Sequence, residues 1–105
     1  MDNMTPLARS VTIPIGMPPG QRAIIAAQTY FGVPLTGRQP ETVEARRAVM
    51  LALRRHGWNL GRIARALGVD RSTVKIGLPF AELTCLRSFH FADGVDHIAA
   101  VLANP

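Results

Sequence analysis

The sequence predicts an all-α fold: a small helical domain with a helix-turn-helix, an extended N-terminal arm and a C-terminal helical segment. Apolar residues recur at the three- and four-residue spacing of a helix in successive segments of the chain. The length of 105 residues leaves room for one domain only. Apolar residues make up 48% of the chain, which is too many for a chain that is disordered throughout.

Residues 1–19 are predicted to form a flexible or extended arm, because four prolines in this stretch deny the continuation of a helix. A first helix is expected over about residues 21–31. Ile24 and Phe31 share one of its faces. Gly32 follows and can adopt the left-handed conformation that ends a helix.

The second and longest helix is expected over about residues 41–56, after a link rich in proline and glycine. At 100° per residue its apolar side chains, among them Val49 and Leu53, fall on one arc. Arg46 lies inside this apolar arc. We therefore expect its charge to be paired with a carboxylate or a phosphate near the end of the helix. Gly57 ends the helix.

The third helix is expected over about residues 60–67, with Asn59 as its N-cap and Gly68 as its left-handed stop. A fourth helix follows Asp70, whose carboxylate can cap the amide of Thr73. Glycine and proline at positions 77 and 79 predict that this helix ends after about two turns.

The chain divides on this basis into the arm at 1–19, a helix-turn-helix domain at 20–79 and a C-terminal segment at 80–105. One helical stretch is expected in the last segment, over about residues 94–103, after a break at residues 92–94. The segment is more apolar than a free tail needs. Two interpretations stay open: it packs back on the helices, or it forms a surface for a partner.

Positive charge is concentrated in the middle of the chain. The whole sequence has a formal net charge of +5. Residues 38–75 alone contain nine cations and three anions. A basic block of this kind fits a polyanionic partner such as nucleic acid. The alternative is a solvated arginine-rich face with no partner.

The spacing of residues 60–75 is typical of a helix-turn-helix. Ala64 is small enough for two helices to cross there, and Gly68 permits the tight turn four residues later. In such a unit the N-terminal residues of the second helix face base edges in the major groove. Arg71 can make a bidentate contact with guanine, and Ser72 can reach a base or a phosphate.

The sequence also resembles two known families. Residues 52–74 resemble the helix-turn-helix of Fis-type bacterial DNA-binding domains. Residues 21–78 resemble the C-terminal duplex-binding domain of the bacterial replication initiator DnaA, through Tyr30-Phe31-Gly32-Val33, Val43-Glu44-Ala45-Arg46-Arg47 and Asp70-Arg71-Ser72-Thr73-Val74. This second resemblance implies that Arg38 enters the minor groove and that Arg46 contacts a phosphate. Stand-alone domains of this type resemble transcription activators of phages and gene-transfer agents.

The sequence therefore predicts a sequence-specific double-stranded DNA-binding protein that acts as a transcription regulator, and by resemblance as an activator. The alternative is a helical adaptor, a protein-interaction subunit of a regulatory complex without DNA specificity of its own. The residues expected to contact DNA are Arg38, Arg46, Arg47, Arg54, Arg62, Arg65, Asp70, Arg71, Ser72, Thr73 and Lys75.

Duplex DNA is the expected partner. A homodimer, and contact of residues 80–105 with a second transcription factor or RNA polymerase, are left open. No apolar run approaches the roughly 20 residues of a membrane span. We expect a cytoplasmic, nucleoid-associated protein.

No catalytic residue, metal site or cofactor is predicted, and the protein is not expected to be an enzyme. Cys85 is the one cysteine, which excludes a disulfide scaffold and favours a free thiol. His56, His90 and His97 do not show the spacing of a metal site. Ser72 lies in the helix-turn-helix pattern without a histidine and aspartate arranged to activate it.

Overall fold

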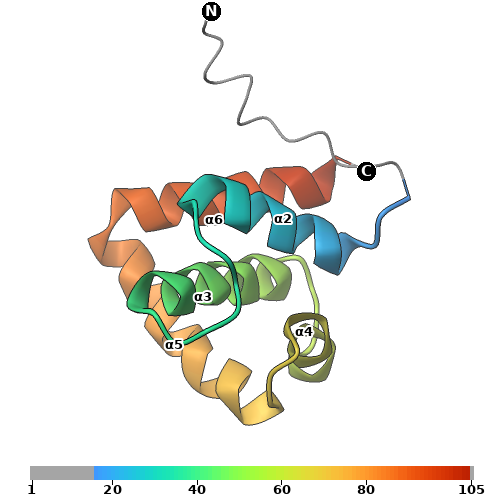
Figure 1. Ribbon diagram of the computed structural model, residues 1–105, viewed down its shortest axis with the longest axis horizontal. Coiled ribbons are helices and arrows are strands. Elements are labelled where there is room, and N and C mark those ends of the chain that lie inside the picture. Colours follow the sequence, from blue (N-terminus) through green and yellow to red (C-terminus); the bar gives the residue numbers. More distant parts are fainter. Residues whose placement is uncertain (1–15, 105) are drawn as a thin grey trace, which may run out of the picture.

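The computed structural model describes residues 16–104, and this range contains five helices and no strand (Figure 1). The expected all-α fold is confirmed. Most of the predicted N-terminal arm, residues 1–15, lies outside the described residues. In chain order the helices are α2 (Pro19–Phe31), α3 (Pro40–Arg55), α4 (Leu60–Leu67), α5 (Arg71–Arg87) and α6 (Phe89–Ala103).

The first three helices form where the local sequence predicts them. Helices α2 and α3 both begin with a proline, whose missing N–H is one that the first turn would leave unpaired. Gly32 ends α2 with φ of +70°. In α4 the Asn59 side chain accepts a hydrogen bond of 2.8 Å from the amide of Arg62, and Gly68 ends the helix with φ of +67°.

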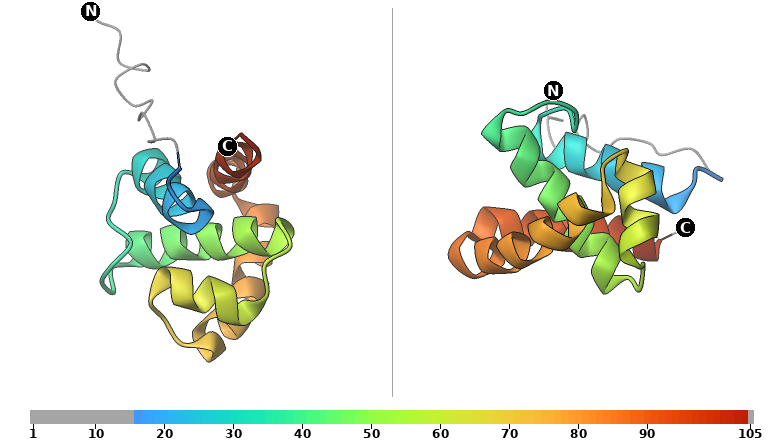
Figure 2. Two further views of the ribbon diagram at one scale, coloured as in Figure 1. Left: turned by 90° about the vertical axis from the view of Figure 1, so that its right-hand side faces the viewer. Right: turned by 90° about the horizontal axis from the view of Figure 1, so that it is seen from below.

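Helix α3 is the centre of the core and packs against all four other helices. The left view of Figure 2 shows α2 and α6 on one side of α3, and α4 and α5 on the other. Such a position requires apolar side chains around most of the helix. Its buried apolar side chains are Ala45, Ala48, Val49, Met50, Leu51, Ala52 and Leu53.

Helix α6 completes the core from the C-terminal end of the chain. Its inward side chains Phe91, Val95, Ile98 and Leu102 are all buried. Of the two interpretations of the C-terminal segment, the one in which it packs back on the other helices therefore holds for α6.

Two features join α6 to α2. Arg22 of α2 donates to the carbonyl of Asn104 at 3.0 Å, next to the end of α6. Gly94 lets α6 approach closely, because a Cβ atom there would lie 2.5 Å from Cζ of Phe31. These features hold the first and last described helices side by side.

The fourth helix is much longer than predicted: α5 continues through Gly77 and Pro79 to Arg87. The prediction that these two residues end it is wrong for reasons of packing. Gly77 lies against α3, where a Cβ atom would come within 2.9 Å of Sδ of Met50. Ala81, one turn further on, is fully buried. Close contact on both sides of the proline outweighs the single backbone hydrogen bond that Pro79 removes.

Two smaller predictions about helix ends are also wrong. Helix α6 starts at Phe89, because the Ser88 side chain accepts from the amide of Phe91 at 3.1 Å and caps the helix there. From Phe89 the helix runs without a break through residues 92–94. The Asp70 carboxylate makes no capping hydrogen bond to α5. Its backbone carbonyl accepts instead from the amide of Thr73 at 3.0 Å.

Candidate nucleic-acid interface

Helices α4 and α5 form the predicted helix-turn-helix. Ile63 and Ala64 of α4 and Val74 of α5 are buried where the two helices meet. The carbonyl of Ala64 accepts from the amide of Val69 at 3.0 Å, which closes the turn around Gly68. This packing fixes the rotation of α5 about its axis.

The N-terminal turns of α5 present polar side chains to solvent as a result. Burial of Val74 leaves Arg71, Ser72, Thr73 and Lys75 exposed. Neither Arg71 nor Lys75 makes a side-chain hydrogen bond or ion pair to any other residue between 16 and 104. Their charged groups are therefore free of partners within the described chain. Asp70, directly before this helix, is exposed as well.

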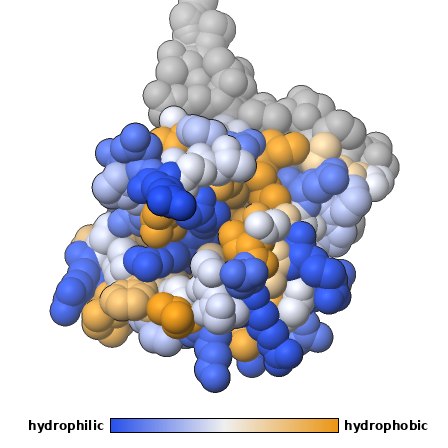
Figure 3. All heavy atoms as spheres, turned by 60° about the horizontal axis from the view of Figure 1, so that its bottom comes forward, coloured by the Kyte–Doolittle hydropathy of each residue, from blue (hydrophilic) through white to orange (hydrophobic). Residues whose placement is uncertain are grey.

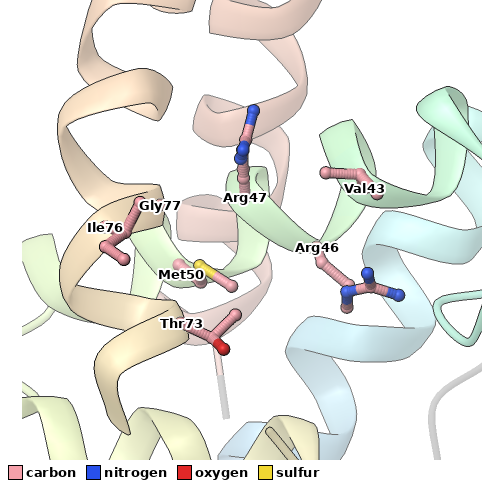
Figure 4. A pocket seen from close by; sticks show the side chains of 7 residues that line it. All are labelled: Val43, Arg46, Arg47, Met50, Thr73, Ile76 and Gly77. Atoms are coloured by element: carbon pink, nitrogen blue, oxygen red, sulfur yellow. The ribbon is translucent and has the colours of Figure 1, made fainter. Parts of the chain in front are cut away.

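A pocket of about 200 Å³ lies between one side of α5 and the N-terminal half of α3. Figure 4 shows Met50 between the two helices, with Arg46 and Arg47 pointing away from each other. Thr73 and Ile76 bound the pocket on the α5 side. The pocket thus brings two of the predicted arginines next to a residue of the expected recognition segment.

A second, shallower pocket of about 350 Å³ lies on the other side of α5. Here Arg54 from the end of α3 and Leu60 from the start of α4 face Lys75 and Pro79. Arg54 also donates to the carbonyl of Trp58 at 2.9 Å, which holds its side chain along the α3–α4 connection. Cations from α3 consequently border α5 on both sides.

Within the described chain, Arg46 is bound by carbonyl oxygens. Its Nη1 donates to the carbonyl of Leu35 at 2.9 Å and to that of Gly37 at 2.8 Å. The half-buried charge is thus satisfied by main-chain oxygens of the link before α3, and not by a carboxylate. This contact also positions Arg38, which follows Gly37 directly and is exposed.

Two further arginines pack against aromatic rings. The guanidinium of Arg62 lies 3.7 Å from the ring centroid of Trp58, and that of Arg47 lies 4.7 Å from the ring centroid of Phe80. Such contacts orient a guanidinium while leaving its edge available. Arg65 is exposed on α4, one turn beyond Arg62.

Other residues of this surface were not among the predicted site residues. Val43 and Met50 line the first pocket with Arg46 and Arg47. Val43, Arg46, Arg47 and Met50 follow one another at helical spacing, since Val43 and Met50 each lie three and four residues from the two arginines. This spacing is a signal that could have identified their shared face. The ion pair of 3.0 Å between Arg55 and Glu82 has no such signal, because it joins residues 27 positions apart on different helices.

Of the side chains considered for other chemistry, Cys85 is half-buried on α5, and His90 and His97 are exposed on α6. Burial raises the pKa of the Cys85 thiol, which disfavours its thiolate form. The rings of His90 and His97 lie 5.0 and 5.5 Å from that of Tyr30. No cluster of metal-ligating side chains occurs in residues 16–104. Over the same range no helix has the length and apolar character needed to cross a membrane.

Comparison with known proteins gives a match to a family model. Residues 41–76, which contain α3, α4 and the first turns of α5, match the model of the homeodomain-like domain. The chain has no significant match among curated proteins or among solved structures. Residues 41–76 are therefore similar to a homeodomain-like helix-turn-helix, a type of unit that binds DNA.

Proposed function

We propose that this protein is a sequence-specific duplex-DNA-binding protein that regulates transcription, with no catalytic activity of its own. The observation that carries the proposal is the exposed N-terminal face of α5, bordered on both sides by arginines of α3. Residues 71–76 of α5 enter the major groove. This role is consistent with the homeodomain-like match and with the basic charge of residues 38–75.

Base recognition in this proposal belongs to the first turns of α5. The guanidinium of Arg71 can donate two hydrogen bonds to the O6 and N7 atoms of guanine. The hydroxyls of Ser72 and Thr73 can reach a base edge or a phosphate. Asp70 has its carboxylate free for a cytosine amine, since it makes no cap hydrogen bond.

Phosphate contacts belong to the cations beside this helix. A major groove is bounded by two phosphate backbones, so a helix lying in it needs positive charge on both sides. Arg47 stands on one side of α5, while Arg54 and Lys75 border the pocket on the other. The exposed Arg62 and Arg65 of α4 add to this charge, since the first helix of such a pair crosses the backbone.

Arg38 is assigned to the minor groove. In homeodomain-like units the segment before the first helix reaches into the minor groove next to the recognition site. Arg38 lies in that segment, directly before α3. Arg46 holds the segment through the carbonyls of Leu35 and Gly37, so we assign it a positioning role in addition to any phosphate contact.

The test is a selection from a random duplex library with the full-length protein, at about 50 mM and about 200 mM salt. One motif enriched at both concentrations supports specific recognition. Binding without a motif reduces the proposal to non-specific DNA binding. No binding at either concentration overturns it and favours the helical adaptor.

Arg71→Ala then tests the recognition helix. Loss of a bidentate contact with guanine should cost about 1–3 kcal/mol and relax the preference at one base position. Arg55→Ala is the matched control, because it removes the same charge from an arginine paired with Glu82. Equal affinity and an unchanged motif for Arg71→Ala would place base recognition elsewhere.

Activation is the direction of regulation that we propose, on the resemblance to phage-type activators. A reporter gene placed behind the selected motif should be expressed more strongly when the protein is present. Lower expression would replace activation by repression without affecting the DNA-binding assignment.

A further inference from the structure

The C-terminal half of α5 carries large apolar side chains that remain exposed in the described structure. Phe80 is 50% exposed, Leu83 42%, Leu86 84%, and Phe89, at the start of α6, 96%. Figure 3 shows hydrophobic atoms open to solvent at the lower left, on the side where α5 meets α6 in Figure 1. We call these four residues the α5 patch.

The α5 patch is one continuous surface. On α5, Phe80, Leu83 and Leu86 follow one another at three-residue spacing, so they lie within one third of the helix circumference and opposite the buried Ala81 and Val74. It continues the exposed face of the recognition segment through Ile76, which is 61% exposed. Any partner bound here therefore lies next to the proposed DNA-binding surface.

From these observations we infer that the α5 patch is the contact between two copies of this protein, related by a twofold axis between Thr84 and Cys85. The first reason is the symmetry of the sequence about that point. Leu83 and Leu86, both on α5, are equally far from it. Antiparallel pairing of two α5 helices consequently places Leu83 of each copy opposite Leu86 of the other, as a self-complementary interface requires.

Charge is the second reason. Residues 76–105 contain a single cation, Arg87, and three anions, so this segment itself lacks the basic character that DNA contact needs. Glu82 and Arg87 are equally far from the axis and have opposite signs. In the paired helices, Glu82 of each copy therefore lies at the same height along the helix axis as Arg87 of the other. Two copies can meet here without strong charge repulsion.

Geometry is the third reason, and it rests on the proposed function. With a rise of about 1.5 Å per residue, Thr73 lies about 17 Å along the helix from the axis. Two antiparallel α5 helices then place their recognition segments about 34 Å apart, which is one turn of duplex DNA. The helices overlap only near their C-terminal ends, so both recognition segments stay free.

The size of the patch sets the strength of the dimer. Phe80 and Phe89 together expose on the order of 300 Å² of side chain. Even with the two leucines, the patch falls short of the roughly 800 Å² per partner that stable complexes bury. The dimer is accordingly weak in free solution and forms efficiently on DNA that holds two copies at the correct distance.

Cooperative binding of the full-length protein to DNA tests the inference. Duplexes with two inverted copies of the selected half-site, centred about 10 base pairs apart, are compared with duplexes lengthened by about 5 base pairs. We expect the second copy to bind on the order of tenfold more tightly at the first spacing only. Leu86→Ser should abolish this gain and leave binding to a single half-site unchanged. Ala100→Ser, at an exposed position on α6, is the control.

Crosslinking tests the register and does not depend on DNA recognition. In a Cys85→Ser background, an equimolar mixture of Leu83→Cys and Leu86→Cys proteins should form a mixed disulfide faster than either protein forms a homodimer. Ala100→Cys should not crosslink with either.

The outcomes separate the two proposals. If the protein binds no duplex but the mixed disulfide forms, the DNA-binding function fails and the dimer stands. If single half-sites are bound, the two spacings give equal affinity and no mixed disulfide forms, the dimer is overturned and the DNA-binding function stands.

Discussion

Tyr30 is the side chain whose ionisation the fold changes most clearly. Its hydroxyl donates to Oδ2 of Asp93 at 2.7 Å, across the contact between α2 and α6. Burial, together with the neighbouring Asp93 carboxylate, raises the pKa of Tyr30 to about 12. The phenol is therefore held in its neutral form far above the value of about 10 that it has in an unfolded chain.

We predict that stability falls as pH rises from about 10 to about 12, because the folded state keeps a proton in this range that the unfolded state releases. The contribution is complete below pH 10. Tyr30 is the one tyrosine of the chain, so phenolate absorption reports on it alone. The midpoint of this absorption titration should lie near pH 12, and Asp93→Asn should lower the midpoint. A wild-type midpoint near 10 would contradict the Tyr30–Asp93 contact.

At the scale of elements, close approach between helices depends on glycines within them. A Cβ atom at Gly94 would lie 2.5 Å from Cζ of Phe31 and 2.9 Å from Cε2 of Tyr30. Neither ring has simple freedom to withdraw, since Tyr30 is held by Asp93 and lies against Phe31 with ring centroids 5.0 Å apart. The α2–α6 contact therefore requires the absence of a side chain at position 94.

We predict that Gly94→Ala destabilises the protein by about 1–3 kcal/mol, the usual cost of overpacking, despite the better helix propensity of alanine. Gly61→Ala is the matched control on α4, where the nearest atoms to a Cβ lie at 3.6 and 3.7 Å. That variant should gain up to about 1 kcal/mol. Chemical denaturation followed by the fluorescence of Trp58 measures both. Equal effects of the two substitutions would contradict the tight α2–α6 contact.

The same scale shows where local sequence reasoning was sufficient and where it was not. The ends of α4 were predictable because Asn59 and Gly68 act on the backbone within a few residues of themselves. The length of α5 was not, because its continuation past Pro79 depends on packing against α3. The local sequence shows that a proline lowers the stability of a helix. Contacts with residues distant in the chain decide whether the helix nevertheless continues through it.

At the scale of the whole molecule, the distribution of charge determines how binding responds to salt. Of the nine cations in residues 38–75, Arg55 is paired with Glu82, Arg46 is assigned a positioning role through two carbonyls of the link before α3, and Arg71 is assigned to a base. Six remain for phosphates: Arg38, Arg47, Arg54, Arg62, Arg65 and Lys75.

Neutralising six phosphates predicts a slope of about −5 for the logarithm of the affinity against the logarithm of salt concentration. Arg65→Ala should weaken binding evenly across sequences and reduce the slope by about one unit. Titrations of the selected duplex at several salt concentrations measure both. A slope near zero, or one unaffected by Arg65→Ala, would show that these cations do not contact the backbone.

The order of the amino acids was enough to predict the helical class of the protein, the helix-turn-helix and the concentration of positive charge in residues 38–75. These properties follow from composition, from spacing along one helix and from caps, all of which act over a few residues. Three other features became visible only in the folded chain: Arg46 is bound by two carbonyls, α5 continues to Arg87, and the α5 patch is exposed. Each of these features depends on contacts between segments that are far apart in the chain. A pattern within a few neighbouring residues does not specify such contacts.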